Sequence, residues 1–315
     1  MKTWLAYLCL GLSMALVGCY VALSKPLVAA FPVLLLAWLR FGTGTVLMMG
    51  WLKPEPQESP LSRATHRLLF LTSFLGNFLF SICMLYGLSL TSASSAGVIL
   101  AAIPAMVAVL SALFLGERLS RLSLFAILCA FVGIGLYASN RPEQTSAAYP
   151  NASIGNLLVF AAVCCEASYA VIGKYLTAHL SAKRIAAVIN VWGLALTTPF
   201  GIYLALQFDF AGVTADKWAL LLFYATAASV VTVWLWMTGL KTIPAHQAGV
   251  FTVFLPITAA AIGVAFFDEV MTGIQVIAFA IALVGVVLAT LPKRGQRGQR
   301  GQCSERAATQ RTSSD

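Results

Sequence analysis

The sequence predicts an all-α membrane protein of ten transmembrane helices, arranged as two inverted five-helix repeats with cytoplasmic N- and C-termini. Three observations predict this fold: the composition, a set of apolar segments of membrane-spanning length, and two stretches that match each other without a gap. Of the 315 residues, 60% are hydrophobic and 10% are charged, and the mean hydropathy is +0.87. Because soluble domains carry about 25% charged residues, most of the chain must be solvated by lipid.

Apolar runs of about 20 residues are long enough to cross a hydrocarbon layer of ~30 Å. The runs are continuously apolar rather than alternating, which excludes membrane β-strands. In chain order they are residues 4–23, 33–52, 68–90, 93–115, 122–138, 154–176, 185–206, 218–240, 245–267 and 274–291. Only a few residues separate the third run from the fourth, and we interpret that junction as a tight hairpin.

The first run also has an alternative interpretation, because Leu16-Val17-Gly18-Cys19 resembles a lipoprotein cleavage site behind a short basic start. Cleavage there would remove one span and leave nine, which breaks the internal repeat described next. We therefore treat the first run as a retained helix.

The stretch from residue 87 to residue 138 matches the stretch that lies 152 residues later. The informative matches pair glycine with glycine, proline with proline and glutamate with glutamate: Gly87 with Gly239, Gly97 with Gly249, Pro104 with Pro256, Glu117 with Glu269, and Gly133 with Gly285. Such a match indicates a duplication. We expect a first repeat over residues 1–139, a linker over 140–153, a second repeat over 154–291 and a tail over 292–315.

Loop charges predict the orientation. With a cytoplasmic N-terminus, sixteen of the Lys and Arg residues fall on the cytoplasmic side and three on the outside, as the positive-inside rule requires. Each repeat contains an odd number of spans, so the two repeats must have opposite orientations. Inverted repeats of this kind build alternating-access carriers whose substrate site lies near the midplane between the halves.

Several short motifs carry a resemblance to a known family. They are Phe31-Pro32-Val33-Leu34-Leu35 with Arg40-Phe41, Gly87-Leu88, Ala96-Gly97, Pro104, Leu115-Gly116-Glu117-Arg118, Ala248-Gly249, Pro256, Glu269 and Gly285. On these residues the chain resembles the EamA-type branch of the drug/metabolite transporter (DMT) superfamily. One departure is Asp268-Glu269-Val270, the counterpart of Gly116-Glu117-Arg118, which lacks the basic residue.

The resemblance implies a multi-pass carrier of the bacterial inner membrane that exports small organic metabolites, amino acids or related compounds above all. An importer or a multidrug efflux carrier on the same fold is the alternative within transport. A membrane-embedded enzyme acting on lipids is the alternative from another class. Such an enzyme would need titratable residues gathered at one membrane face, whereas the charges here are dispersed among loops.

Two charged residues lie inside predicted spans. Glu166 lies near the middle of the span 154–176, where a carboxylate costs about 2.5–3.5 kcal/mol or more, and is a candidate for proton coupling. Arg40 lies in the span 33–52 and could bind a substrate carboxylate through its planar guanidinium. The structural alternative is an ion pair, of Glu166 with Arg40 or Lys174, or contacts with helix backbone.

A second group of candidates consists of polar-tipped and aromatic residues within spans. A small-molecule site needs a few such groups in an apolar wall. The group comprises Asn77, Tyr86, Tyr169, Asn190, Trp192, Trp234 and Trp236. Helix packing or a position in the membrane interface is the alternative for each of them.

Prolines mark the candidate hinges. Pro104 and Pro256 fall within matching spans, and we predict that each produces a kink or gating hinge by removing a helix hydrogen bond. The alternative is that proline is simply common in membrane helices. Gly97 and Gly249 belong to the same gating segments and are expected to permit close helix packing. Glu117 and Glu269, at span ends, are expected to cap helices and to form structural pairs.

Several classes of function are excluded by what the sequence lacks. It contains no Walker A motif for ATP, and its three His residues show no metal-ligand spacing, so we expect no cofactor and no metal. The seven Cys residues do not suggest disulfides. The net charge of +9 reflects basic loops and a basic tail rather than a nucleic-acid surface. We expect the tail to be disordered and to lie on anionic lipids.

Overall fold

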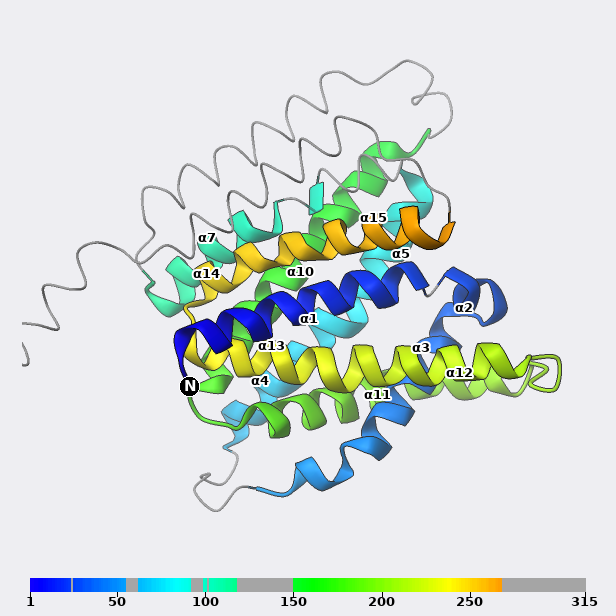
Figure 1. Ribbon diagram of the computed structural model, residues 1–315, viewed down its shortest axis with the longest axis horizontal. Coiled ribbons are helices and arrows are strands. Elements are labelled where there is room, and N and C mark those ends of the chain that lie inside the picture. Colours follow the sequence, from blue (N-terminus) through cyan, green and yellow to red (C-terminus); the bar gives the residue numbers. More distant parts are fainter. Residues whose placement is uncertain (24, 55–61, 92–98, 101, 118–149, 268–315) are drawn as a thin grey trace, which may run out of the picture.

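The computed structural model describes residues 1–23, 25–54, 62–91, 99–100, 102–117 and 150–267. Regular structure within these residues is entirely helical (Figure 1). The helices of the first half are α1 (Thr3–Leu23), α2 (Lys25–Ala30), α3 (Val33–Leu47), η1 (Met49–Leu52), α4 (Arg63–Ser73), η2 (Phe74–Leu79), α5 (Phe80–Leu90) and α7 (Ile103–Leu115). Those of the second half are α10 (Ala152–Thr177), α11 (Ala182–Ala205), α12 (Ala215–Ala225), η3 (Thr226–Val231), α13 (Thr232–Thr242), α14 (Ala245–Val250), η4 (Phe251–Val253) and α15 (Phe254–Phe267).

Helix ends coincide with capping residues in the sequence. The side chain of Ser62 accepts a hydrogen bond from the backbone N–H of Thr65 at the start of α4, and Ser181 does the same for Arg184 at the start of α11. These contacts satisfy backbone donors that have no partner within a helix. Gly116 ends α7 in the left-handed conformation, with φ of 65°, which glycine adopts without steric cost.

Membrane-spanning segments account for most of the described residues. Five helical stretches are long and apolar enough to cross a membrane: Thr3–Tyr20, Arg63–Met84, Ala152–Thr177, Ala182–Ala205 and Ala215–Thr242. Two shorter apolar helices, Val33–Leu47 and Ile103–Leu115, lie where two further spans were predicted. The predicted spans 122–138 and 274–291 and the predicted tail lie outside the described residues, as do Gly97 and Glu269.

The same succession of segments occurs twice at the spacing of the sequence match. Adding 152 to the bounds of α4, η2 and α5 gives the bounds of α12, η3 and α13. The middle segment of each series, η2 or η3, is one turn of π-helix. A π-helix is rare and often lies at a functional site, so its occurrence at equivalent positions is a specific similarity between the two halves.

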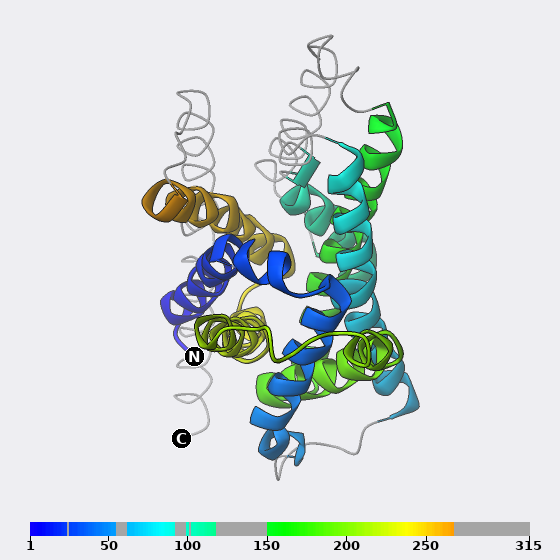
Figure 2. The same ribbon diagram turned by 90° about the vertical axis from the view of Figure 1, so that its right-hand side faces the viewer.

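Helix packing interleaves the two halves. Helix α1 packs against α13 and α15, whereas its counterpart α10 packs against α5 and α7, and α3 packs against α11. The first long helix of each half therefore packs against helices of the other half. In Figure 1, α1 runs away from the N-terminus, whereas α10 begins at the opposite side and ends near it. Figure 2 shows α1 and α15 on one side of the molecule and α5, α7 and α10 on the other.

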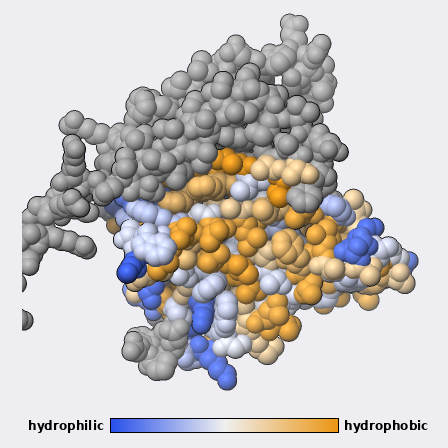
Figure 3. All heavy atoms as spheres, viewed as in Figure 1, coloured by the Kyte–Doolittle hydropathy of each residue, from blue (hydrophilic) through white to orange (hydrophobic). Residues whose placement is uncertain are grey.

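The surface has the pattern of a protein embedded in lipid. Apolar residues form a broad band across the described face, and hydrophilic residues gather toward its ends (Figure 3). Large apolar side chains such as Leu113, Phe114, Leu157 and Leu206 are more than half exposed. In water such a surface would aggregate, whereas in a bilayer it faces hydrocarbon.

The prolines lie at breaks between helical segments rather than inside continuous helices. Pro104 is in the first turn of α7, which begins at Ile103, and Pro256 is in the first turn of α15, which follows the short 3₁₀ segment η4. A proline in a first turn removes a backbone N–H that has no helical acceptor, so it starts a helix without kinking it. Each proline therefore lies where one helical segment begins, and the gating role expected of Pro104 and Pro256 stays a prediction.

Candidate functional site

A charged and aromatic cluster lies where α1, α3, α10 and α12 approach one another. Tyr20 of α1 interacts electrostatically with Arg40 of α3, Tyr224 of α12 and Glu166 of α10. Tyr169, one turn beyond Glu166 on α10, interacts with Glu166, Tyr20 and Arg40. The two charged residues singled out in the sequence therefore interact electrostatically with the same two tyrosines.

Two aromatic rings lie near the guanidinium of Arg40. Its central carbon lies 4.2 Å from the ring centroid of Phe41 and 5.9 Å from that of Tyr224. The rings of Tyr20 and Tyr224 pack edge to face with centroids 5.4 Å apart. Cation–π contacts of this kind hold a guanidinium without neutralising its charge.

Arg40 and Glu166 have no ion-pair partner among the residues that the structure describes. The buried Nε of Arg40 also lacks a hydrogen-bond partner there. Lys174, the other cation considered for Glu166, instead donates a hydrogen bond of 2.7 Å from its Nζ to the carbonyl oxygen of Leu240. Among the described residues neither group therefore has a partner of opposite charge, and keeping an unpaired charge in the membrane interior is costly.

Both π-helical segments border this cluster. Gly76 of η2 lies against the ring of Tyr169, where an added Cβ would overlap the ring atoms. Ser229 of η3 lies against Gly44 of α3, and its hydroxyl donates to the carbonyl oxygen of Arg40 at 3.5 Å. The two π-segments thus help to position Tyr169 and Arg40.

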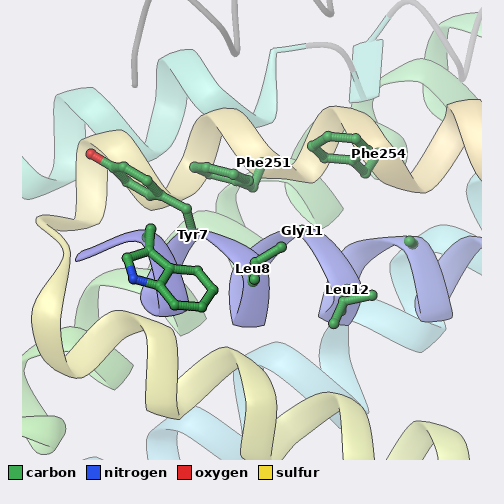
Figure 4. A pocket seen from close by; sticks show the side chains of 8 residues that line it. Tyr7, Leu8, Gly11, Leu12, Phe251 and Phe254 are labelled. Atoms are coloured by element: carbon green, nitrogen blue, oxygen red, sulfur yellow. The ribbon is translucent and has the colours of Figure 1, made fainter. Parts of the chain in front are cut away.

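A separate groove on the outside of the molecule is apolar. The groove has a volume of about 520 Å³ and lies between α1 and the segment that runs from η4 into α15. Figure 4 shows the rings of Tyr7, Phe251 and Phe254 in a row above Leu8 and Leu12. Trp4, Leu8 and Leu12 are each at least half exposed on this face. A groove of this composition suits hydrocarbon and offers no charge to a polar substrate.

No group of three or more His, Cys, Asp or Glu residues that could hold a metal ion occurs among the described residues. The polar cluster offers one carboxylate, one guanidinium and three phenol groups. That set can bind opposite charges on a small molecule and stack against an apolar portion of it.

Comparison with known proteins identifies the family. The EamA-like transporter family matches this chain twice, over residues 4–139 and 153–291. The chain belongs to the EamA-like transporter family. This EamA-like protein is 31% identical over 293 residues to the uncharacterized transporter YetK of Bacillus subtilis (strain 168), covering 92% of this chain and 88% of YetK. It is 23% identical over 261 residues to the uncharacterized transporter YyaM of the same organism, covering 81% of this chain and 83% of YyaM.

A solved crystal structure shares the fold of this EamA-like transporter. The TM-score is 0.69 at 18% sequence identity, over 92% of this chain and 97% of the solved chain. The predicted membership of the DMT superfamily is confirmed, and the protein is a multi-pass bacterial membrane transporter rather than an enzyme.

The other predicted site residues of the EamA-like transporter are dispersed. Asn77 lies in η2 next to Gly76, whereas Tyr86 is 60% exposed on α5. Trp192 packs edge to face on Phe70, with centroids 5.0 Å apart. The structure therefore brings Arg40, Glu166 and Tyr169 together and leaves Tyr86 and Trp192 at the periphery of the helices.

Two of the predicted residues are fully buried. Asn190 is 1% exposed and donates through Nδ2 to the carbonyl oxygens of Ala186 and Ser229, both at 2.9 Å. Trp236 is also 1% exposed and lies in the main apolar core. Gly249 packs against Val107 of α7, where a Cβ would lie 3.0 Å from the valine side chain, as expected for close helix packing.

Tyr20 and Tyr224 were missed by sequence reasoning. Tyr20 directly follows the cleavage-like motif, and Tyr224 lies in an apolar run two residues before Thr226. The one feature of the sequence that could have marked them as site residues is that each places a hydroxyl group within a predicted span. A single tyrosine is common in membrane helices, however, and only the packing of α1, α3 and α12 brings these two beside Arg40.

Proposed function

We propose that this EamA-like transporter exports amino acids or related zwitterionic compounds by alternating access. The substrate would lie between Arg40 and Glu166, with its carboxylate at the guanidinium and its ammonium group at the carboxylate. Tyr20, Tyr169 and Tyr224 would form the wall against which its side chain packs.

The observation that carries this proposal is the absence of an ion pair for either charge within the described structure. Two opposite charges that interact with the same tyrosines, and that lack an ion-pair partner in the described part of the chain, are costly in a membrane unless a ligand provides the missing partners. A zwitterion provides both partners at once. Glu166 would also take part in proton coupling, because a carboxylate that releases an ammonium group can accept a proton in its place.

The arrangement of the halves supports alternating access. The helix bounds repeat at a spacing of 152 residues, and the long helices α1 and α10 exchange places between the halves. With five predicted spans in each repeat and a basic cytoplasmic side, the repeats would be inverted and both termini would be cytoplasmic. Two similar halves in opposite orientations give inward-open and outward-open states of similar energy.

The test uses purified protein in liposomes loaded with radiolabelled amino acids and other metabolites. Efflux is followed with and without a proton gradient for the wild type, Glu166→Gln and Arg40→Gln. Asp216→Asn, which removes a carboxylate from the exposed start of α12, is the matched control. We expect efflux of at least one zwitterion that both site variants slow by tenfold or more, on the order of one lost charge-assisted contact.

Each outcome discriminates between proposals. Flux that responds to the gradient only in proteins retaining Glu166 supports proton coupling, whereas flux that ignores both the gradient and the mutation assigns Glu166 a structural role. Uptake in preference to efflux indicates an importer. Transport of apolar cations alone, unaffected by Arg40→Gln, supports multidrug efflux and overturns the zwitterion proposal.

A further inference from the structure

A second polar cluster lies at the end of α7, far along the chain from Arg40. Gly116 turns the chain in its left-handed conformation directly after α7, and its neighbour Glu117 then points to the start of α14. The two residues belong to the first half of the chain, and α14 belongs to the second. The contact therefore joins the halves across 128 residues or more of sequence.

Glu117 makes three hydrogen bonds in this contact. Its Oε1 accepts from the backbone N–H of Ala245 at 3.0 Å, and its Oε2 accepts from the backbone N–H of His246 at 3.2 Å. The imidazole Nδ1 of His246 donates to the same Oε2 at 2.7 Å. The glutamate and histidine side chains are 15% and 10% exposed, so water competes little with these bonds.

Lys174 completes the cluster from a third helix. It interacts electrostatically with Glu117, while its Nζ donates to the carbonyl oxygen of Leu240 at the end of α13. One carboxylate from the first half thus contacts an imidazole and two backbone N–H groups from the second and interacts electrostatically with an ammonium group. We call these three side chains, Glu117, Lys174 and His246, the inter-half latch.

The other repeat does not encode the same latch. At a spacing of 152 residues, Glu117 corresponds to Glu269, but Lys174 corresponds to Ala22 and His246 to Ser94. In an inverted repeat, Glu269 belongs to the opposite membrane face. The positions equivalent to Lys174 and His246 therefore provide no cationic partner at that face. In a pair of otherwise similar halves, such a difference makes the two end states unequal in energy.

We propose that the inter-half latch closes the cytoplasmic gate and biases the carrier toward the outward-open state. This inference rests on the alternating-access mechanism proposed above and goes beyond it, because it assigns the bias to named residues. Breaking the latch shifts the population toward the inward-open state without touching the substrate site.

The test measures distances in the full-length protein in lipid nanodiscs, with the seven native cysteines replaced. Spin labels at Leu113→Cys in the last turn of α7 and Thr242→Cys at the end of α13 report the opening between the halves at this face; both positions are exposed. We expect Glu117→Gln to raise the longer-distance population by about fivefold or more. Lys174→Ala and His246→Ser, which introduce the residues of the other repeat, should give smaller increases.

A second variant separates gating from simple destabilisation. Adding Glu269→Gln, the change at the equivalent position of the other repeat, to Glu117→Gln should move the distances back toward those of the wild type, because both end states then lose a carboxylate at equivalent positions. A structural cap alone predicts additive loss of thermal stability and no reversal, and that result overturns the latch. Asp216→Asn is the matched control and should leave the distances unchanged. Because the measurement needs no substrate, a failed transport assay and a failed latch are distinguishable.

Discussion

The imidazole of His246 donates a hydrogen bond of 2.7 Å to the carboxylate of Glu117, 129 residues earlier in the chain. With the backbone bonds from Ala245 and His246, it makes Glu117 the cap of α14. The expectation that Glu117 caps a helix and forms a structural pair is therefore confirmed. The helix that it caps lies in the other half of the chain.

The contact predicts a dependence of stability on pH. Burial disfavours ionisation of Glu117, but the hydrogen bonds from the His246 side chain and from the Ala245 and His246 backbone outweigh it and lower the pKa to about 2. Because this is below the ordinary value of 4.5, the carboxylate stabilises the fold above pH 4.5 and loses its contribution as the pH falls toward 2. We expect Glu117→Gln to cost about 1–3 kcal/mol at pH 7.

The measurement is thermal unfolding of both proteins in detergent between pH 7 and pH 3. The difference in melting temperature between wild type and Glu117→Gln should shrink on acidification below about pH 4.5, because the unfolded wild type then binds a proton at Glu117 that the folded protein binds only near pH 2. A difference that stays constant over this range would show that the charge of Glu117 does not contribute.

Replacing either of two glycines at matching positions, Gly87 and Gly239, is expected to lower stability. A Cβ on Gly239 would lie 2.6 Å from Leu10 Cγ and 3.0 Å from the carbonyl oxygen of Ala6, and a Cβ on Gly87 would lie 2.8 Å from Val159 and 3.1 Å from the carbonyl oxygen of Gly155. Backbone oxygens cannot move aside as a flexible side chain can. Gly239→Ala and Gly87→Ala should each cost about 1–3 kcal/mol.

Thermal melting of the purified variants tests this pair. Gly50→Ala is the control, because nothing lies within 4 Å of its Cβ position, and it should leave the melting temperature unchanged or raise it slightly. Equal melting temperatures for all three variants would contradict close packing of α1 with α13 and of α5 with α10.

A substitution at Gly76 is expected to change transport because it moves the ring of Tyr169. An alanine at this position overlaps the tyrosine ring, which must move within the charged cluster to make room. We expect Gly76→Ala to raise the KM for the transported compound several-fold, while the added helix propensity of alanine offsets part of any loss of stability. The liposome assay measures this effect beside Gly50→Ala, and an unchanged KM would remove Tyr169 from the proposed site.

Asn190 is predicted to stabilise a π-segment. Its Nδ2 donates to the carbonyl oxygen of Ser229 in η3, and a buried acceptor that loses its donor costs about 1–3 kcal/mol. Asn190→Ala should therefore lower the melting temperature by several degrees. Asn151→Ala removes an exposed amide that makes no capping bond and should have little effect. A similar melting temperature for both would indicate that water replaces the amide of Asn190.

Much of the fold could be predicted from the sequence because lipid imposes a strong constraint. Spans need continuous apolar runs, so the described helices overlap the predicted runs, and the spacing of 152 residues between Gly87 and Gly239 recurs in the bounds of α5 and α13. The breaks before Pro104 and Pro256 were not predicted. A proline can kink a helix or start one, and local sequence does not decide between the two.

The candidate site was predictable only in part. Glu166 and Arg40 were recognisable because a charge within an apolar run is rare and costly. Tyr20 and Tyr224 were not, because a tyrosine is unremarkable in a membrane helix until its neighbours are known. Asn190 had the right chemistry for a binding residue, but packing against η3 uses its amide to satisfy a backbone carbonyl.

The sequence by itself determined that this chain is an α-helical membrane transporter with an internal repeat, because hydropathy, length and repeated glycines and prolines are local properties of the chain. Tertiary structure decided which residues meet. It placed Arg40 and Glu166 where both interact with Tyr20 and Tyr169, without an ion pair among the described residues, and it brought Glu117 to His246 across the two halves. The reason is physical: charges and hydroxyl groups interact over a few ångströms, and only helix packing brings residues far apart in the chain within that range.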